Sequence, residues 1–406
     1  MGLLACTFVA ASEYLRAGPV EWGLRSDSDK TPMQPLSGIR VLDFSTLLPG
    51  PMATLLLAEA GAEVIKIERP EGGEELRSYR PRFADTSVSF AMLNRGKGSI
   101  AIDLKAPDAL SRLRPLLAVT DVVVEQFRPG VMNRLGLGYE ALSTVNPRIV
   151  YCAITGYGQN GPKAQVAAHD LNYQADAGLL SIAAGPDGSP VVPNALSADI
   201  AGGAYPAVIN ILLALRNREH TGKGCKLDIA MTDGLLPFLY WGIGNGVATG
   251  SWPSPGGELL SGGSPRYQIY RTADGKHLAA APLEDRFWAN FCDAIELPAV
   301  LRDDRKDAQA TRAAVAEIIL RRTAREWLAR LEGKDVCCNV VRNVKEAMAD
   351  PQFAARGAFQ RSVVSDGATL PAVTVPIDPA FRDRATEVRY PKLGESSALL
   401  GPAPDK

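Results

Sequence analysis

The chain is poor in histidine, and its few cysteines show no pattern. Its 406 residues include 3 histidines and 6 cysteines, and no two cysteines stand in a C-x-x-C arrangement. These absences argue against a zinc cluster and against a disulfide framework, and they fit a protein of the reducing cytoplasm. A chain of this length buries a core large enough to need no disulfide.

An excess of charge of either sign is also lacking. Lys and Arg together number 44 against 45 for Asp and Glu, which leaves a formal net charge of -1. Bulk electrostatics therefore gives no support for nucleic acid or an anionic membrane as a partner. No uninterrupted run of about 18 apolar residues is found, so we expect no membrane-spanning helix.

The first 32 residues show no period that joins them to the rest of the chain. Residues 3–11 are apolar, but no basic segment precedes them and Glu13 and Arg16 follow closely, which makes a poor signal peptide. Residues 33–38 lead directly into a strand pattern. We predict that residues 1–34 are an extension outside the fold, with Met33 as the native start or residues 1–32 as a loose appendage.

Short apolar strands alternate with helices from Ile39 onward. Strands are predicted at 38–44, 62–68, 99–104, 121–125, 148–155 and 225–230, and helices at 51–60, 107–118, 139–144 and 201–216. Two apolar strands separated by one helix form a βαβ unit, in which the strands are parallel and the crossover is right-handed. The repeated alternation predicts an α/β fold with an open, mostly parallel sheet and helices on both faces.

Glycine and proline crowd together at 240–265, a composition typical of a loop. We read residues 236–265 as a linker between a large unit at 35–235 and a smaller unit at 266–350. The smaller unit has strand patterns at 267–270 and 277–281 and helix patterns at 285–294, 310–322 and 324–331. Residues 351–406 are expected to return to the large unit as mostly extended chain. Cys337 and Cys338 are taken as buried core.

Residues 156–161 (GYGQNG) match G-x-G-x-x-G directly after a predicted strand. A dinucleotide site needs the third glycine inside a helix whose N-terminus faces a pyrophosphate. Here Pro162 follows, and no periodic segment comes directly after it. The motif is better interpreted as a turn at Gly156 and Gly158 that lets another group approach the backbone. A nicotinamide-dependent hydride-transfer enzyme stays open as an alternative.

Basic residues bracket the early strands of the predicted sheet. Each one alone is typical of a solvated surface charge. Several of them follow a strand or lie in a turn that leads into one, and in an open parallel sheet the carboxyl ends of the strands share the edge where ligands bind. Cations gathered at that edge suit a polyphosphate. The residues concerned are Lys66, Arg69, Arg95, Lys97, Arg128 and Arg134.

A His-Asp pair, His169 and Asp170, stands immediately before a small apolar helix. An imidazole and a carboxylate at a helix start suit acid–base chemistry, and the free backbone N–H groups there can stabilise an oxyanion. The structural alternative makes Asp170 a helix N-cap and His169 a loop histidine. Two further acids, Asp199 and Glu284, also precede helix patterns and carry the same two interpretations.

Six segments in the same order resemble the family III coenzyme A transferases (CaiB/BaiF type), a family that includes the alpha-methylacyl-CoA racemases. They are residues 35–43, 63–69, 94–99, 128–131, 156–159 and 169–173. The resemblance implies an acyl-CoA substrate, with no metal and no cofactor beyond the coenzyme A of that substrate. It also implies an interlocked-ring homodimer in which each chain has a large Rossmann-like domain and a smaller domain, expected here to be α+β.

The resemblance also implies roles for the four acid–base residues. In the transferase branch a covalent aspartate nucleophile matches Asp170, whereas the racemase branch matches His169, Asp170, Asp199 and Glu284. We therefore expect racemisation of 2-methyl-branched acyl-CoA thioesters, with His169 and Asp199 as the two bases and Glu284 orienting His169. The alternatives are coenzyme A transfer through a mixed anhydride at Asp170 and a coenzyme A-binding scaffold without turnover. Coenzyme A is expected to contact Arg69, Asn94, Arg95, Lys97, Arg128, Arg134, Gly156 and Gly158.

Overall fold

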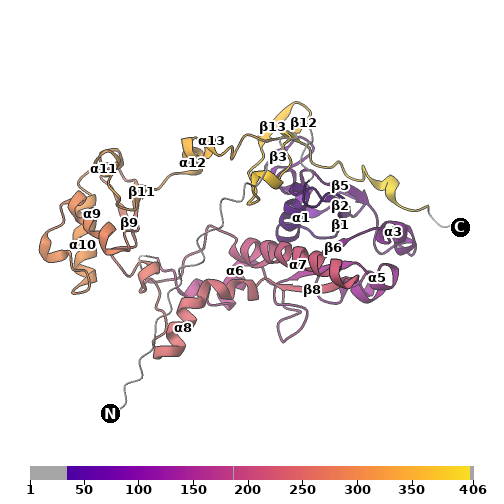
Figure 1. Cartoon of the computed structure of the whole chain (residues 1–406), viewed down its shortest axis with the longest axis horizontal. Helices are drawn as coiled ribbons and strands as arrows, with labels where there is room; N and C mark the ends of the chain where they lie inside the picture. The colour runs from indigo at the N-terminus through magenta and orange to yellow at the C-terminus, as the bar shows by residue number, and fades with distance from the viewer. Residues whose placement is uncertain (1–33, 186, 403–406) are drawn as a thin grey trace, which may run out of the picture. The chain divides into compact units, whose positions relative to one another are not determined.

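The computed structural model describes residues 34–185 and 187–402, so the expectation for residues 1–32 lies outside the described residues. A six-stranded sheet in which every strand pair is parallel forms the centre of the large unit (Figure 1). The α/β class with a parallel sheet is confirmed. In sheet order the strands are β5 (Gly98–Ala101), β2 (Glu63–Glu68), β1 (Arg40–Asp43), β6 (Val122–Glu125), β7 (Val150–Thr155) and β8 (Cys225–Ala230).

The strand order changes direction next to β1. The chain adds β2 and then β5 on one side of β1, and it crosses back to place β6, β7 and β8 on the other side. The loops that follow β1 and β6 therefore diverge at the carboxyl edge of the sheet. Such a switch point is where open parallel sheets bind their ligands.

Both faces of the sheet are covered by helices, and each face has its own apolar core. Val41, Val122 and Val124 point toward one face, whereas Leu42 and Val123 point toward the other. Strands buried on both sides explain the nearly continuous apolar runs in the sequence. One face is covered by α1 (Pro49–Glu59) and α7 (Tyr205–Thr221), and the other by α3 (Ala109–Leu117) and α5 (Tyr139–Val145).

Two smaller sheets follow later in the chain. An antiparallel sheet of β9 (Gln268–Arg271), β10 (His277–Ala280) and β11 (Cys338–Val340) shares a core around Phe291 and Trp327 with its helices. The helices of this unit are α9 (Asp285–Ile295), α10 (Ala308–Ile319) and α11 (Ala324–Leu331). The other sheet is formed by β12 (Ser362–Ser365), β13 (Ala368–Pro371) and β14 (Glu387–Val388). Its Val363 joins Phe90 in one buried cluster, so this segment packs on the large unit.

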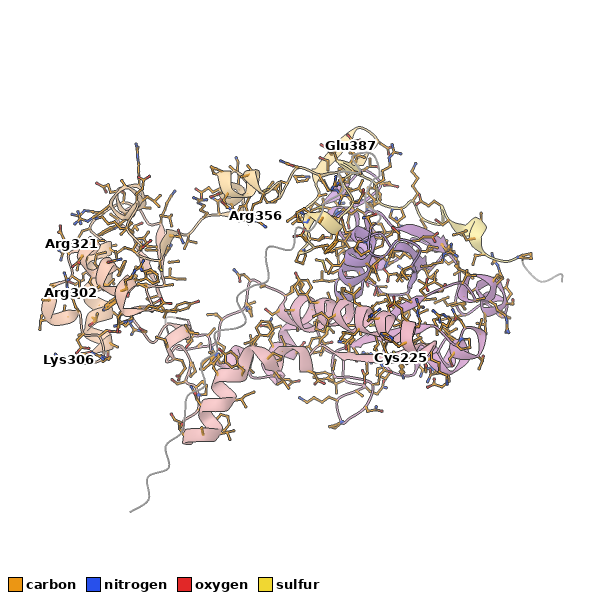
Figure 2. The ribbon with its side chains drawn as sticks, viewed as in Figure 1. Cys225, Arg302, Lys306, Arg321, Arg356 and Glu387 are labelled. Carbon is orange, nitrogen blue, oxygen red and sulfur yellow. The ribbon has the colours of Figure 1, made fainter. Side chains whose placement is uncertain are left out.

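The remaining elements are helices and helical turns of three to ten residues and two strands of two residues. They are η1 (Glu75–Ser78), β3 (Arg82–Phe83), β4 (Thr86–Ser87), α2 (Val88–Asn94), α4 (Val131–Arg134), α6 (Asp170–Asp176), η2 (Leu179–Ser181), η3 (Ala198–Ala204), η4 (Asp233–Leu239), α8 (Tyr240–Thr249), η5 (Leu259–Ser261), η6 (Ala299–Leu301), α12 (Val344–Met348), α13 (Pro351–Ala355), η7 (Pro379–Phe381) and η8 (Ser397–Leu399). The strand β8, which closes the large sheet, begins at Cys225 as predicted (Figure 2).

The structure corrects three expectations. Residues 240–249 form the helix α8 and not a loop, because Gly242 and Gly246 let Pro253 and Trp252 pack against the helix backbone. The segment after residue 351 is more regular than predicted, because it contains three short strands and the helical turns α13, η7 and η8. Elements of two to five residues are too short to show a period in the sequence. Cys337 is exposed and adopts a left-handed backbone conformation, so the expectation of a buried residue is wrong.

The helical stretch Ala198–Thr221, which η3 and α7 form together, bears on the expectation that no helix spans a membrane. By length and composition this stretch is apolar enough to cross a membrane. A search of the sequence for an uninterrupted apolar run does not detect it. Core helices pass the same test. Ala207, Ile211 and Ala214 of this stretch are buried against the sheet, so we assign it to the core of the large unit.

Candidate active site

A cavity of about 310 Å³ opens at the switch point of the large sheet. The turn after β1 contributes Thr46, Leu47 and Pro49, and the loop after β6 contributes residues 126–129. The end of β7, the start of α6 and the helix η3 complete the wall with Thr155, Gly156, His169, Tyr173 and Asp199. Segments that lie far apart in the sequence therefore bring two proton-carrying side chains, His169 and Asp199, to one cavity.

The His-Asp pair begins α6, and its two side chains differ in exposure. The backbone N–H of His169 donates to Asn172 Oδ1 at 3.0 Å, and its imidazole is exposed at the cavity. Asp170 is only 5% exposed. Its Oδ1 accepts from the backbone N–H of Asp199 at 2.9 Å, and its Oδ2 accepts from Gln174 Nε2 at 2.6 Å. The carboxylate of Asp170 is therefore fixed by hydrogen bonds and links α6 to η3.

Asp199 lies in η3, which is a π-helical turn, and such turns are frequent at functional sites. The turn packs closely on the chain after β8, because a Cβ at Gly202 would lie 2.4 Å from the carbonyl oxygen of Met231. The pKa of Asp199 is raised to about 6, mainly by burial and to a smaller extent by the negative charge of Asp170, while His169 opposes the rise. A carboxylate with this pKa is suited to both accept and release a proton near neutral pH.

The glycine turn after β7 fixes the aromatic wall of the cavity. A Cβ at Gly156 would lie 2.3 Å from Cε1 of Tyr173, so only glycine leaves room for this ring. Tyr173 donates its hydroxyl hydrogen to the carbonyl oxygen of Ala168 at 2.7 Å, next to His169. Gly158 adopts a φ of +83° and does not line the cavity. The next helix begins only at Asp170, so the motif lacks the helix that a dinucleotide site requires.

A second cavity, of about 720 Å³, adjoins the first at Thr46 and Phe127, which line both. The predicted residues Arg69 and Arg134 line it. Both side chains are exposed, and Arg128 is exposed in the first cavity. These three guanidinium groups thus lie along one continuous lining, with apolar side chains such as Ile67, Ile102 and Leu135 beside them.

Other predicted basic residues are buried inside the fold. Lys97 donates to Asp43 Oδ2 at 3.1 Å and to Thr54 Oγ1 at 2.7 Å, and Arg95 Nε donates to Glu59 Oε1 at 2.9 Å. The backbone of Arg95 and Lys97 precedes β5 and so lies toward the amino end of that strand, although the Lys97 side chain reaches Asp43 at the carboxyl end of β1. Neither residue lines either cavity. The buried amide of Asn94 also accepts from Lys97, at 2.9 Å. A coenzyme A contact for Asn94, Arg95 and Lys97 stays a prediction.

Glu284 immediately precedes α9, and its side chain is exposed. It is not among the residues that line the cavity with His169. Its role as the partner of His169 stays a prediction.

Sequence reasoning did not single out Thr155 or Tyr173 as residues of the cavity. Thr155 is 7% exposed, and within the described ranges it is the only lining residue whose buried side-chain oxygen has no hydrogen-bond partner. A threonine at the end of a strand carries no sequence signal for such a position. Within residues 34–185 and 187–402 no group of three or more His, Cys, Asp or Glu side chains is placed to hold a metal ion.

Comparison with known proteins identifies the family. The model of CoA-transferase family III matches residues 36–397. The succinate–glutarate CoA-transferase of Agrobacterium fabrum is 35% identical over 381 residues, which cover 90% of this chain and 94% of that protein. The alpha-methylacyl-CoA racemase of Homo sapiens is 34% identical over 372 residues, which cover 89% of this chain and 91% of that protein.

A solved structure of a CAIB/BAIF family protein from Brucella suis superposes with a TM-score of 0.76 at 30% identity, covering 90% of this chain and 98% of that one. The family model spans the strands, the cavity and the smaller sheets alike, and the resemblance drawn from six short segments is confirmed. The chain belongs to CoA-transferase family III.

Proposed function

We propose that this protein racemises 2-methyl-branched acyl-CoA thioesters by proton transfer between two bases. The observation that carries the proposal is the difference between the two aspartates. Asp199 lines the cavity together with His169, whereas Asp170 does not line it and has both carboxylate oxygens hydrogen-bonded within the protein. A two-base reaction needs His169 and Asp199 in the same cavity. A covalent mechanism needs an Asp170 carboxylate that is free to attack the thioester.

Racemisation removes the proton next to the thioester carbonyl and returns a proton to the opposite face of the same carbon. In one direction neutral His169 accepts the proton and protonated Asp199 donates one, and in the other direction the roles reverse. The pKa of Asp199, raised to about 6 by burial and then by Asp170, leaves both of its forms accessible near neutral pH. Asp170 acts as a positioning residue, because it binds the backbone N–H of Asp199 and its charge supports the raised pKa.

The enolate intermediate carries negative charge on the former carbonyl oxygen. Backbone N–H groups at the start of α6 and in the turn at Gly156 are the candidate donors for this oxygen, because both segments line the cavity beside His169. The coenzyme A portion would extend past Thr46 and Phe127 into the second cavity. There Arg69 and Arg134 would bind its phosphate groups.

The proposal is tested by incubating the enzyme with a 2-methylacyl-CoA in D₂O without an acceptor acid. We expect exchange of the α-hydrogen together with loss of optical purity. His169→Ala and Asp199→Asn should each lower the rate by roughly 10²–10⁴-fold, which is typical of a lost general acid–base group. Absence of exchange in the wild-type enzyme would refute racemisation.

Coenzyme A transfer is the second candidate, and the relatives named as CoA-transferases favour it. In this reaction Asp170 attacks the thioester carbonyl, releases coenzyme A thiolate and forms a mixed anhydride. The thiolate then attacks the Asp170 carbonyl, which releases the first carboxylate and leaves an aspartyl-CoA thioester. The acceptor carboxylate displaces the thiolate to form a second anhydride, and attack of the thiolate on the acceptor's acyl carbonyl gives the new acyl-CoA and frees Asp170. This requires Asp170 to leave its contacts with Gln174 and Asp199. Acylation of Asp170 that is sensitive to hydroxylamine, together with no α-hydrogen exchange, would support transfer.

We propose further that Glu284 acts on His169 from the partner chain of an interlocked homodimer. Its exposed position at the start of α9 leaves the carboxylate free to reach another chain. Exposed apolar side chains support an interface between copies, among them Ile209 and Leu213 on α7 and Val247 on α8.

A further inference from the structure

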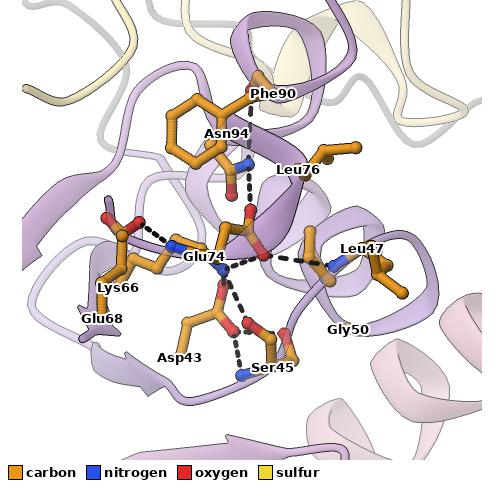
Figure 3. Close-up of polar contacts among 12 residues, drawn as sticks. Asp43, Ser45, Leu47, Gly50, Lys66, Glu68, Glu74, Leu76, Phe90 and Asn94 are labelled. Atoms are coloured by element: carbon orange, nitrogen blue, oxygen red, sulfur yellow. Dashed lines mark hydrogen bonds and ion pairs between the residues drawn. The ribbon is translucent and has the colours of Figure 1, made fainter. Parts of the chain in front are cut away.

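Four charged side chains are buried beneath the segment that joins β1 to α1 and includes the first two residues of that helix (residues 44–50, the β1 turn). They are Asp43, Lys66, Glu74 and Lys97, and no side chain among them is more than 2% exposed. Figure 3 shows Lys66 between the carboxylates of Asp43 and Glu74. Lys66 Nζ lies 3.4 Å from Glu74 Oε2 and 3.9 Å from Asp43 Oδ2.

Two members of this cluster bind the backbone of the β1 turn directly. Lys66 Nζ donates to the carbonyl oxygen of Ser45 at 2.7 Å, and Glu74 Oε2 accepts from the backbone N–H of Leu47 at 3.1 Å. Asp43 Oδ1 accepts from the backbone N–H of Ser45 at 2.9 Å. Successive backbone groups of the turn are thus held by buried charges (Figure 3).

Leu47 needs such support, because it has a φ of +62°. The left-handed region is unfavourable for a residue with a Cβ, and it persists only where the surroundings impose it. The β1 turn is also the shared wall of the cleft, since it gives Thr46, Leu47 and Pro49 to the first cavity and Thr46 to the second. The strained residue therefore lies where the two cavities meet.

Stability alone is a weak reason for this cluster. Burying several charges costs desolvation energy that their attraction offsets only in part, and apolar residues of similar size often serve stability as well or better. Lys66 lines neither cavity, so it has no direct contact to offer a ligand. Glu74 is among the residues of the second cavity, but its side chain is only 2% exposed, and its carboxylate faces Lys66 and the backbone N–H of Leu47. Lys66 and Glu74 have in common that each forms a hydrogen bond with the backbone of the β1 turn.

We propose that Lys66 and Glu74 are positioning residues that hold the β1 turn, with Leu47 in its left-handed conformation, in the shape that receives the coenzyme A thioester. This inference rests on the proposed function for the identity of the ligand. Its structural part, the hold on the turn, does not depend on which reaction the enzyme catalyses.

The experiment compares four variants of the full chain, and the first of them, Lys66→Met, removes the donor to the carbonyl oxygen of Ser45. Glu74→Leu removes the acceptor of the Leu47 N–H, whereas Glu74→Gln keeps an oxygen acceptor and removes only the charge. Glu59→Leu is the matched control, because Glu59 is also a buried carboxylate that pairs with an arginine, at the far end of the helix that follows the turn. Hydrogen exchange of the 44–50 segment is measured without ligand, and coenzyme A affinity by calorimetry, with thermal stability recorded for each variant.

We expect Glu74→Leu to speed exchange at Leu47 by at least about tenfold and to weaken coenzyme A binding by at least about tenfold, because a buried hydrogen bond is lost. Glu74→Gln should stay within about threefold of wild type in both. Glu59→Leu should lose stability without either effect. Lys66→Met should reproduce Glu74→Leu, since it frees the carbonyl group of Ser45.

Unchanged exchange in both Glu74→Leu and Lys66→Met would overturn the positioning role. Equal loss of protection in Glu59→Leu would also overturn it, since general destabilisation would then suffice. Faster exchange with unaltered coenzyme A affinity would overturn the link to the ligand. A wild-type enzyme that binds no coenzyme A would instead refute the proposed function, and the exchange data would still decide whether the pair holds the turn.

Discussion

Asp199 shows how a residue can serve a site at the expense of the fold. Its folded pKa of about 6 lies above the ordinary value of 3.8, chiefly because the side chain is buried and then because Asp170 lies nearby. The folded state therefore binds the proton of Asp199 more tightly than the unfolded state does. Stability falls as the pH rises from about 4 through about 6, and the charged carboxylate destabilises the fold at pH 7.

Asp199→Asn is accordingly expected to lower racemisation and to raise stability together. The amide removes the buried charge, which should contribute on the order of 1–2 kcal/mol at pH 7 after allowance for partial exposure. Urea unfolding of both proteins at pH 4 and pH 7 checks this, since the gain should be largest at pH 7. An equal difference at both pH values would contradict the assigned titration.

Asp170→Asn is expected to shift the pH dependence of α-hydrogen exchange in the 2-methylacyl-CoA substrate. The charge of Asp170 raises the pKa of Asp199, so removal of this charge should lower that pKa. In a plot of exchange rate against pH, the change of rate near pH 6 that reports the titration of Asp199 should therefore move to lower pH. Asp187→Asn, a change at an exposed carboxylate outside the cavity, serves as the control. A change of rate that stays at its wild-type pH in Asp170→Asn would show that another group titrates there.

Thr155→Val tests whether the buried hydroxyl of Thr155, which has no hydrogen-bond partner in the structure, contributes to stability. Removing a polar atom that makes no hydrogen bond should leave stability unchanged or raise it by up to about 1 kcal/mol. Thr54→Val is the contrast, because Thr54 donates to Asp43 Oδ2 at 2.6 Å and its loss should cost about 1–3 kcal/mol. Thermal unfolding of the two variants measures the difference, and a destabilised Thr155→Val would mean that its hydroxyl has a partner in solution.

At the scale of elements, helix α8 shows where composition misleads. Its glycines suggest a loop, yet Gly246 is the point at which Trp252 packs on the helix, since a Cβ there would lie 2.3 Å from the indole ring. Gly244 of the same helix has open space around it. A sequence pattern gives the residue types but not the distant residues that pack against them. Gly244 and Gly246 therefore receive the same prediction from the sequence, although only Gly246 is in contact with Trp252.

The two glycines of α8 should respond oppositely to alanine. Gly244→Ala is expected to stabilise the protein by about 0.5–1 kcal/mol, because alanine loses less backbone entropy in a helix. Gly246→Ala is expected to destabilise it by about 1–3 kcal/mol, because the methyl group overlaps Trp252. Chemical denaturation of both variants decides, and a stabilised Gly246→Ala would show that Trp252 does not pack on the helix at this position in solution.

At the scale of the whole molecule, our proposal for Glu284 places the two parts of the site on two chains. His169 lies at the switch point of the large sheet, and Glu284 begins a helix beside a different sheet. If these residues meet across an interlocked dimer, each site takes its imidazole from one chain and its glutamate from the other.

Coexpression of His169→Ala and Glu284→Gln chains is the test. Sites shared between chains leave one intact site in each mixed dimer, so random pairing should restore about a quarter of wild-type activity. Sites contained within one chain would leave every site defective, and the mixture would show no recovery. Each variant expressed alone serves as the control, and size-exclusion chromatography confirms the oligomeric state.

The sequence by itself determined the alternation of strands and helices, because apolar periodicity is a local property that a parallel sheet buried on both faces imposes on every strand. It also determined the residues at the start of α6, since a polar pair before an apolar helix is visible within a few positions. Only the tertiary structure decided that Asp199 joins His169 while Asp170 is tied down by Gln174. It also decided that Lys66 and Lys97 are buried and Arg69 exposed, because burial depends on segments distant in sequence that pack around each charge.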